Sequence, residues 1–252
     1  MSINTTQAAE TQQYLEANPE LLEFLKEWDE YYRQRVTQIS IFNYKKTSQW
    51  TLDQKSHFIK VFYHCRGHFH ELLWFIASYA PDKAAKDIII ANIVDEIGEN
   101  GFSHEKLFGM TAQAVGVDIT KEYINHDTYL PFAKAFNQGH LQWLNDHNWD
   151  GKMSAFAALE RLDNVDYVKG KELAESLGLK GKELTFFNVH IHVDHFGDVL
   201  KGALIDIWNR DPAIVKEAFY FIADHQMKMW NDLSNEVFNY SRKSVNRVET
   251  IT

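Results

Sequence analysis

Three segments of the chain carry carboxylate and imidazole side chains at spacings suited to binding metal ions. Six residues in these segments are candidate ligands: Glu96, His104, Glu160, His190, Asp194 and Asp198. Their surroundings are largely apolar, where a charged group is costly to bury unless a partner or a metal ion compensates its charge. Such ligands on facing helices can hold two iron or manganese ions and leave positions open for dioxygen. The pattern therefore predicts a dinuclear metal site.

The third segment is expected to present three ligands on one helix face. Successive residues of an α-helix turn by about 100°, so positions i, i+4 and i+8 share a face. His190, Asp194 and Asp198 have this spacing, whereas His192 and His195 belong to other faces and are poorer candidates. The alternative, a solvated histidine-rich helix, is disfavoured because the segment contains many apolar residues.

The first segment needs a distortion of its helix to bring its two ligands together. Glu96 and His104 are eight residues apart, which corresponds to about 12 Å along a straight helix. Gly98 and Gly101 lie between them and predict a bulge that shortens this distance. Glu99 is a rival ligand, although we favour its interpretation as an exposed carboxylate.

Glu160 follows Ala158 and Leu159 at the end of an apolar stretch. Such a glutamate is usually a boundary residue, so its assignment as a ligand depends on the other candidates. The chain has one cysteine, Cys65, which excludes an intramolecular disulfide and a thiolate metal cluster. Any metal ion must therefore be held by histidine and carboxylate.

The elements that position these residues are expected to be helices. The chain has 252 residues, of which 45% are hydrophobic and 14% aromatic, with only four prolines and 12 glycines. Its polar stretches are rich in helix-forming residues, which predicts an all-α protein. We find no repeat or flexible linker, so residues 1–252 are expected to form a single domain. Residues 1–8 and 244–252 are expected to be frayed ends.

Apolar periodicity and capping residues predict seven or eight helices. Seven of the expected helices cover about residues 19–39, 51–80, 82–98, 102–116, 118–147, 183–208 and 212–240. A further helix is expected to follow a loop at residues 149–151 and to run through Phe156, Leu159 and Leu162.

The net charge and the hydropathy of the chain argue against nucleic acid and membranes as partners. The formal net charge is −9, which disfavours nucleic acid because binding to phosphates requires a clustered basic surface. The amino terminus does not resemble a signal peptide, and the apolar runs are too short to cross a bilayer. We therefore expect a cytoplasmic protein that binds a small-molecule substrate and neither nucleic acid nor membrane.

Taken in order, five of these residues resemble the pattern of the haem-oxygenase-like dimetal oxidases. This superfamily shares its helical fold with the TenA and PqqC proteins and includes the CADD-like group. Its pattern is a glutamate, a histidine, the glutamate of an Ala-Leu-Glu motif, and His-x3-Asp-x2-His. The matching residues are Glu96, His104, Glu160, His190 and Asp194. The final histidine of the pattern falls at Gly197, which has no side-chain ligand, and we substitute Asp198 for it.

The resemblance covers about residues 55 to 235 and implies a single-domain haem-oxygenase-like bundle. It implies a non-haem di-iron(II) oxidase in which Glu160 bridges the metal ions, with manganese as an alternative to iron. Dioxygen would be the co-substrate. The substrate would be a small amine- or carboxylate-bearing metabolite, undergoing decarboxylation, C–C or C–N cleavage, N-oxygenation or nitrile formation in amino-acid or cofactor metabolism. A homodimer is also consistent with the resemblance.

Two other functions remain open on the sequence. The first is a cofactor-free, TenA-like hydrolase with Cys65 as nucleophile and His64 or His68 as base, although a single cysteine on an aromatic helix is usually a buried apolar residue. The second is a helical protein that binds a ligand in an aromatic pocket without converting it. His64 and His68 also have metal-ligand spacing, but Arg66 lies between them and they fall outside the pattern. We therefore expect them to line a substrate pocket.

Overall fold

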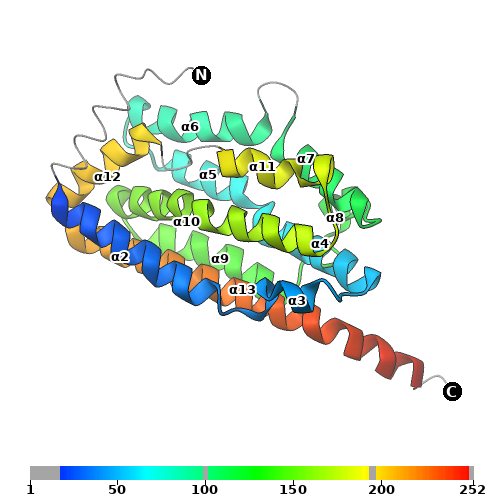
Figure 1. Ribbon diagram of the computed structural model, residues 1–252. Helices are drawn as coiled ribbons and strands as arrows, with labels where there is room; N and C mark the ends of the chain where they lie inside the picture. Colours follow the sequence, from blue (N-terminus) through cyan, green and yellow to red (C-terminus); the bar gives the residue numbers. More distant parts are fainter. Residues whose placement is uncertain (1–17, 99–101, 193–196, 250–252) are drawn as a thin grey trace.

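The computed structural model describes residues 18–98, 102–192 and 197–249 (Figure 1). All regular secondary structure within these ranges is helical, which confirms the expected all-α class. The helices are α2 (Pro19–Val36), η1 (Ser40–Phe42), α3 (Tyr44–Thr47), α4 (Leu52–Arg66), α5 (Phe69–Ser78), α6 (Lys83–Ile97), α7 (His104–Ala114), α8 (Thr120–Asn125), α9 (Pro131–Asp146), α10 (Trp149–Ser176), η2 (Gly181–Leu184), α11 (Thr185–His192), α12 (Asp198–Arg210) and α13 (Pro212–Glu249).

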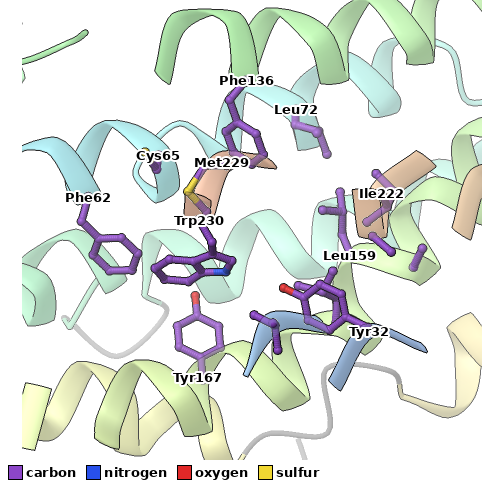
Figure 2. Close-up of a cluster of buried hydrophobic side chains, with 14 of the residues drawn as sticks. Tyr32, Phe62, Cys65, Leu72, Phe136, Leu159, Tyr167, Ile222, Met229 and Trp230 are labelled. Atoms are coloured by element: carbon purple, nitrogen blue, oxygen red, sulfur yellow. The ribbon is translucent and has the colours of Figure 1, made fainter. Parts of the chain in front are cut away.

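Helix α10 occupies the centre of the bundle. It packs against α2 and α13 on one side and against α11 on the other, and α11 in turn contacts α7, which contacts α6 (Figure 1). The buried hydrophobic side chains form one cluster. Within it, Trp230 of α13 lies near Phe62 and Tyr167, which come from α4 and α10 (Figure 2). This core fixes α10 relative to the helices that carry the candidate ligands.

A buried carboxylate joins three helices inside this core. Asp166 of α10 accepts hydrogen bonds from the Tyr32 hydroxyl at 2.6 Å, Gln226 Nε2 at 2.7 Å and Trp230 Nε1 at 2.9 Å. Burial raises the pKa of Asp166 to about 6, although the nearby Arg66 guanidinium acts in the opposite direction. The three donors are buried and need this acceptor, so the carboxylate stabilises the packing of α2 and α13 on α10.

Several helices that we expected to be continuous are divided. The expected helix at 51–80 consists of α4 and α5, and that at 118–147 consists of α8 and α9, because Pro131 begins a new helix. The expected helix at 183–208 is also wrong, because Gly197 is an extended, non-helical N-cap residue and α12 begins after it at Asp198. Local periodicity does not reveal such breaks, because the apolar face continues on the next helix.

Both ends of the chain were expected to be frayed, and only the carboxyl-terminal end can be compared with the structure. The expected fraying of residues 1–8 lies outside the described residues. At the other end, α13 continues to Glu249 instead of ending near Tyr240. No glycine or proline follows Tyr240 to stop the helix. In the described part of the chain, none of the helices combines the length and the hydropathy required to span a bilayer.

Candidate metal centre

Glu96 and His104 meet because one helix ends and another begins between them. Gly98 is the C-cap residue of α6, and its φ of 85° lies in the left-handed region that favours glycine. Helix α7 then starts at His104, with the Ser103 side chain accepting a hydrogen bond from the Lys106 backbone. His104 Nδ1 consequently lies 3.0 Å from Glu96 Oε1. The expected bulge within a continuous helix is therefore corrected to a helix break.

Replacing Gly98 with alanine is expected to disrupt this junction. The added Cβ would lie 2.5 Å from the Phe102 carbonyl carbon, in a backbone conformation that L residues rarely adopt. We expect the free energy of unfolding to fall by about 2–4 kcal/mol and metal affinity to fall with it, because Glu96 and His104 would separate. Urea unfolding and metal titration measure the two effects.

Gly116 provides the matched control for this prediction. Its φ is also positive, at 75°, but no atom lies within 4 Å of the position of an added Cβ. Gly116→Ala should therefore cost about 1–2 kcal/mol, from backbone strain alone, and leave metal affinity unchanged. Equal effects of the two substitutions on stability and on metal affinity would contradict the proposed role of Gly98.

His190 of α11 is held in one orientation by its neighbours. Its Nδ1–H donates a hydrogen bond to the Phe186 carbonyl oxygen at 2.6 Å. In the neutral ring, Nε2 then keeps the lone pair with which a histidine binds a metal ion. The ring stacks on Tyr167 at 3.9 Å between centroids, and the residue is 2% exposed. This fixed orientation is typical of a metal-binding histidine.

The three side chains converge on one point. One ligand atom of each of Glu96, His104 and His190 lies within 4.8 Å of those of the other two. His104 Nδ1 is buried and, among the described residues, has no hydrogen-bond partner, although Glu96 Oε1 is 3.0 Å away. A buried nitrogen without a partner costs free energy unless something binds it. Two histidines and one carboxylate with open positions are the ligand set of non-haem ferrous iron. The residues present therefore fit an iron ion.

A cavity of about 440 Å³ adjoins these three ligands. Aromatic side chains form much of its wall, including Tyr63, Phe108 and Tyr167. Arg66 also lines it and donates hydrogen bonds to Asp163 at 2.6 Å and to the Tyr167 hydroxyl at 3.1 Å. The cavity thus combines aromatic surface with a few charged and polar side chains, Arg66, Glu96 and Glu105 among them, which is the usual composition of a small-molecule site.

The other three predicted ligands, Glu160, Asp194 and Asp198, are not among the described residues that form this cluster. Glu160 is 3% exposed in α10, on the helix face of Asp163 and Tyr167, about 10 Å along the helix from Tyr167. Asp194 lies outside the described residues, as does the rival Glu99. Asp198 is the first residue of α12, after Gly197 as N-cap. The argument that Asp198 continues the His190 face is therefore wrong, because the two residues belong to different helices, while its role as a ligand stays a prediction.

Cys65 is poorly suited to act as a nucleophile. It is 4% exposed, and burial raises the pKa of its thiol well above the usual range, although the nearby Arg66 charge lowers it. The reactive thiolate is therefore disfavoured. One ring nitrogen of His64 faces Glu122 at 3.1 Å and the other faces His68 at 3.4 Å, so this histidine is not poised as a base for Cys65.

Sequence reasoning missed two groups of residues in this region. Arg66 and Tyr167 line the cavity, yet Arg66 was treated only as an interruption between two histidines, and Tyr167 falls in no motif. His126 joins His64 and His68 in a second cluster of potential ligands. No local spacing relates His126 to the other two, because the cluster forms only when α8 packs beside α4.

Comparison with known proteins agrees with this geometry. A sequence model of a family described as iron-containing redox enzymes, Haem_oxygenas_2, matches residues 56–196. No curated protein matches the chain.

Solved structures show the same fold at low sequence identity. A domain of unknown function with a heme oxygenase-like fold from Shewanella denitrificans OS217 superposes with a TM-score of 0.69 at 13% identity, covering 88% of this chain and 94% of that one. A CADD-like protein of unknown function from Nostoc punctiforme PCC 73102 gives 0.63 at 17% identity, covering 85% and 99%.

The fold expected from the sequence is therefore confirmed as haem-oxygenase-like. The family match spans more than half of the chain and contains Glu96, His104, Glu160 and His190. The protein belongs to the Haem_oxygenas_2 family of iron-containing redox enzymes.

Proposed function

We propose that this protein is a non-haem di-iron oxidase or oxygenase that acts on a small metabolite carrying an amine or a carboxylate. The observation that carries the proposal is the convergence of Glu96, His104 and His190, each of which has one potential ligand atom within 4.8 Å of those of the other two. A protein that only binds an organic ligand does not need these three side chains to converge.

One ion would be held by Glu96, His104 and His190. For the second ion we propose Glu160, Asp194 and Asp198, with Glu160 bridging the two. A buried glutamate on the central helix of the bundle supports this assignment, since helical dimetal proteins draw their ligands from facing helices. Manganese accepts the same ligands, and we propose iron because the family is one of iron-containing enzymes.

The surrounding side chains would position the substrate. The cavity volume of about 440 Å³ accommodates a molecule the size of an amino acid. Arg66 is paired with Asp163 at 2.6 Å, and the remaining N–H groups of its planar guanidinium would bind a substrate carboxylate. Tyr167 contacts both the guanidinium and the His190 ring. Bound iron would supply the activation of dioxygen, while the aromatic wall would limit the access of water to the reacting groups.

The proposal is tested by loading the apo-protein with ferrous iron without air and measuring oxygen uptake with a panel of amino acids, amines and fatty acids. We expect uptake that requires iron and is accelerated by one substrate class. The Cys65→Ala variant should keep the wild-type rate, because the buried thiol has no role in this chemistry. Hydrolysis by the metal-free protein that disappears in Cys65→Ala would instead establish the hydrolase. Binding of a panel member with iron-independent affinity and no oxygen uptake would establish a binding protein.

A further inference from the structure

A second cluster of potential metal ligands lies outside the centre described above. His64 belongs to α4, His68 is the N-cap residue of α5, and His126 is the C-cap residue of α8, with a left-handed φ of 54°. One ring nitrogen of each lies within 4.8 Å of those of the other two. Three segments of the chain therefore bring three imidazoles to one point.

The outward nitrogens of two of these rings face carboxylates. His64 Nε2 lies 3.1 Å from Glu122 Oε2, and His68 Nδ1 lies 2.9 Å from Glu71 Oε1. Glu122 also accepts hydrogen bonds from the Thr128 backbone and hydroxyl, at 3.0 and 2.9 Å. A carboxylate that accepts the outer N–H of a histidine fixes its tautomer and leaves the other nitrogen for a metal ion.

When the other two nitrogens carry the protons that bind these carboxylates, His64 Nδ1 and His68 Nε2 carry lone pairs, and these lone pairs face each other. His64 Nδ1 and His68 Nε2 are 3.4 Å apart. Two acceptors at this distance require either a shared proton or a cation between them. A tetrahedral ion with bonds of about 2.05 Å places its ligand nitrogens about 3.4 Å apart, the separation found here.

The site is rigid on one side and open on the other. The Tyr129 ring stacks on both imidazoles, with centroids 4.7 Å from His64 and 4.8 Å from His68. The side chain of His64 is fully buried and that of His68 is 9% exposed, whereas His126 is exposed. An ion could therefore enter past His126 and meet two ligands that are already oriented.

We propose that His64, His68 and His126 bind a divalent transition-metal ion of the zinc class, separate from the iron centre. Three neutral imidazoles suit zinc and cobalt, and they leave a fourth position for water or another small ligand. Tyr63 contacts the His64 ring and also lines the cavity beside Glu96, so this ion would lie behind one wall of that cavity.

The experiment titrates the apo-protein with Co²⁺ and follows both the bound metal after dialysis and the visible absorption of cobalt. The informative variant is His126→Ala, because this exposed residue can be removed without opening the core. We expect it to raise the dissociation constant of one cobalt ion by more than about tenfold and to remove its visible bands. His68→Gln should do the same, and circular dichroism checks that both variants are folded.

Two controls separate this site from the iron centre. His190→Ala should abolish the other bound ion and leave the His126-dependent absorption unchanged. His147→Ala changes a histidine outside both clusters, one that pairs with Glu217, and should leave cobalt binding as in wild type. Cobalt stoichiometry and spectra that are the same in wild type, His126→Ala and His68→Gln would overturn the proposal. That result would leave a shared proton as the link between His64 and His68, and it would not affect the iron centre.

Discussion

Replacing His190 with alanine is expected to lower the affinity for ferrous iron by more than about 100-fold. Residues that only orient metal ligands contribute about 10- to 100-fold to affinity, so the loss of a ligand should exceed that range. The Phe186 carbonyl and Tyr167 hold this imidazole in a fixed orientation, so the substitution removes a ligand that is already positioned. Anaerobic iron titration followed by desalting and elemental analysis measures the change.

His192 offers a matched control on the same helix. It is exposed, whereas His190 is 2% exposed, and both lie in α11. His192→Ala should therefore retain the iron affinity of wild type. If His190→Ala and His192→Ala bind iron equally well while both remain folded, the assignment of His190 as a ligand is wrong.

Replacing Asp166 with alanine should have the largest effect on stability. The substitution leaves the donors of Tyr32, Gln226 and Trp230 without an acceptor inside the core. Each unsatisfied buried donor costs about 1–3 kcal/mol, so we expect the free energy of unfolding to fall by about 3–6 kcal/mol. A domain is stabilised by about 5–15 kcal/mol in total, so the variant should be close to unfolding at ambient temperature. Urea denaturation followed by circular dichroism measures the loss.

The comparison for Asp166 is an aspartate of α13 near the surface. Asp232 pairs with Lys228 one turn away, and its side chain is 31% exposed. Exposed pairs of this kind contribute about 0–1 kcal/mol, so Asp232→Ala should change stability by no more than that. A loss for Asp166→Ala as small as that for Asp232→Ala would show that the buried network does not hold α2 and α13 on α10.

The sequence predicted the helical class, and it also singled out three side chains that the structure brings together. Apolar periodicity and the scarcity of glycine and proline are properties of the whole chain, so local errors did not alter the class. Glu96, His104 and His190 were identified by residue type in apolar surroundings. The structure brings them together through the turn at Gly98 and the packing of α7 on α11.

What could not be predicted depends on where helices break and which helices pack together. The prediction that Asp198 shares the His190 face assumed one continuous helix, and the extended backbone of Gly197 shows that Asp198 begins a new helix. The convergence of His126 with His64 depends on contacts between segments that are distant in sequence. Asp166 resembles a surface carboxylate in sequence, because its three donors lie on α2 and α13.

The central claim is most directly tested by counting the ferrous iron retained per chain after anaerobic loading. The measurement is best made in the His126→Ala protein, so that the second histidine cluster does not contribute. Our account predicts about two irons per chain, as helical di-iron proteins hold, and no more than one after Glu160→Ala or His190→Ala. No retained iron, or retention that neither substitution changes, would contradict it.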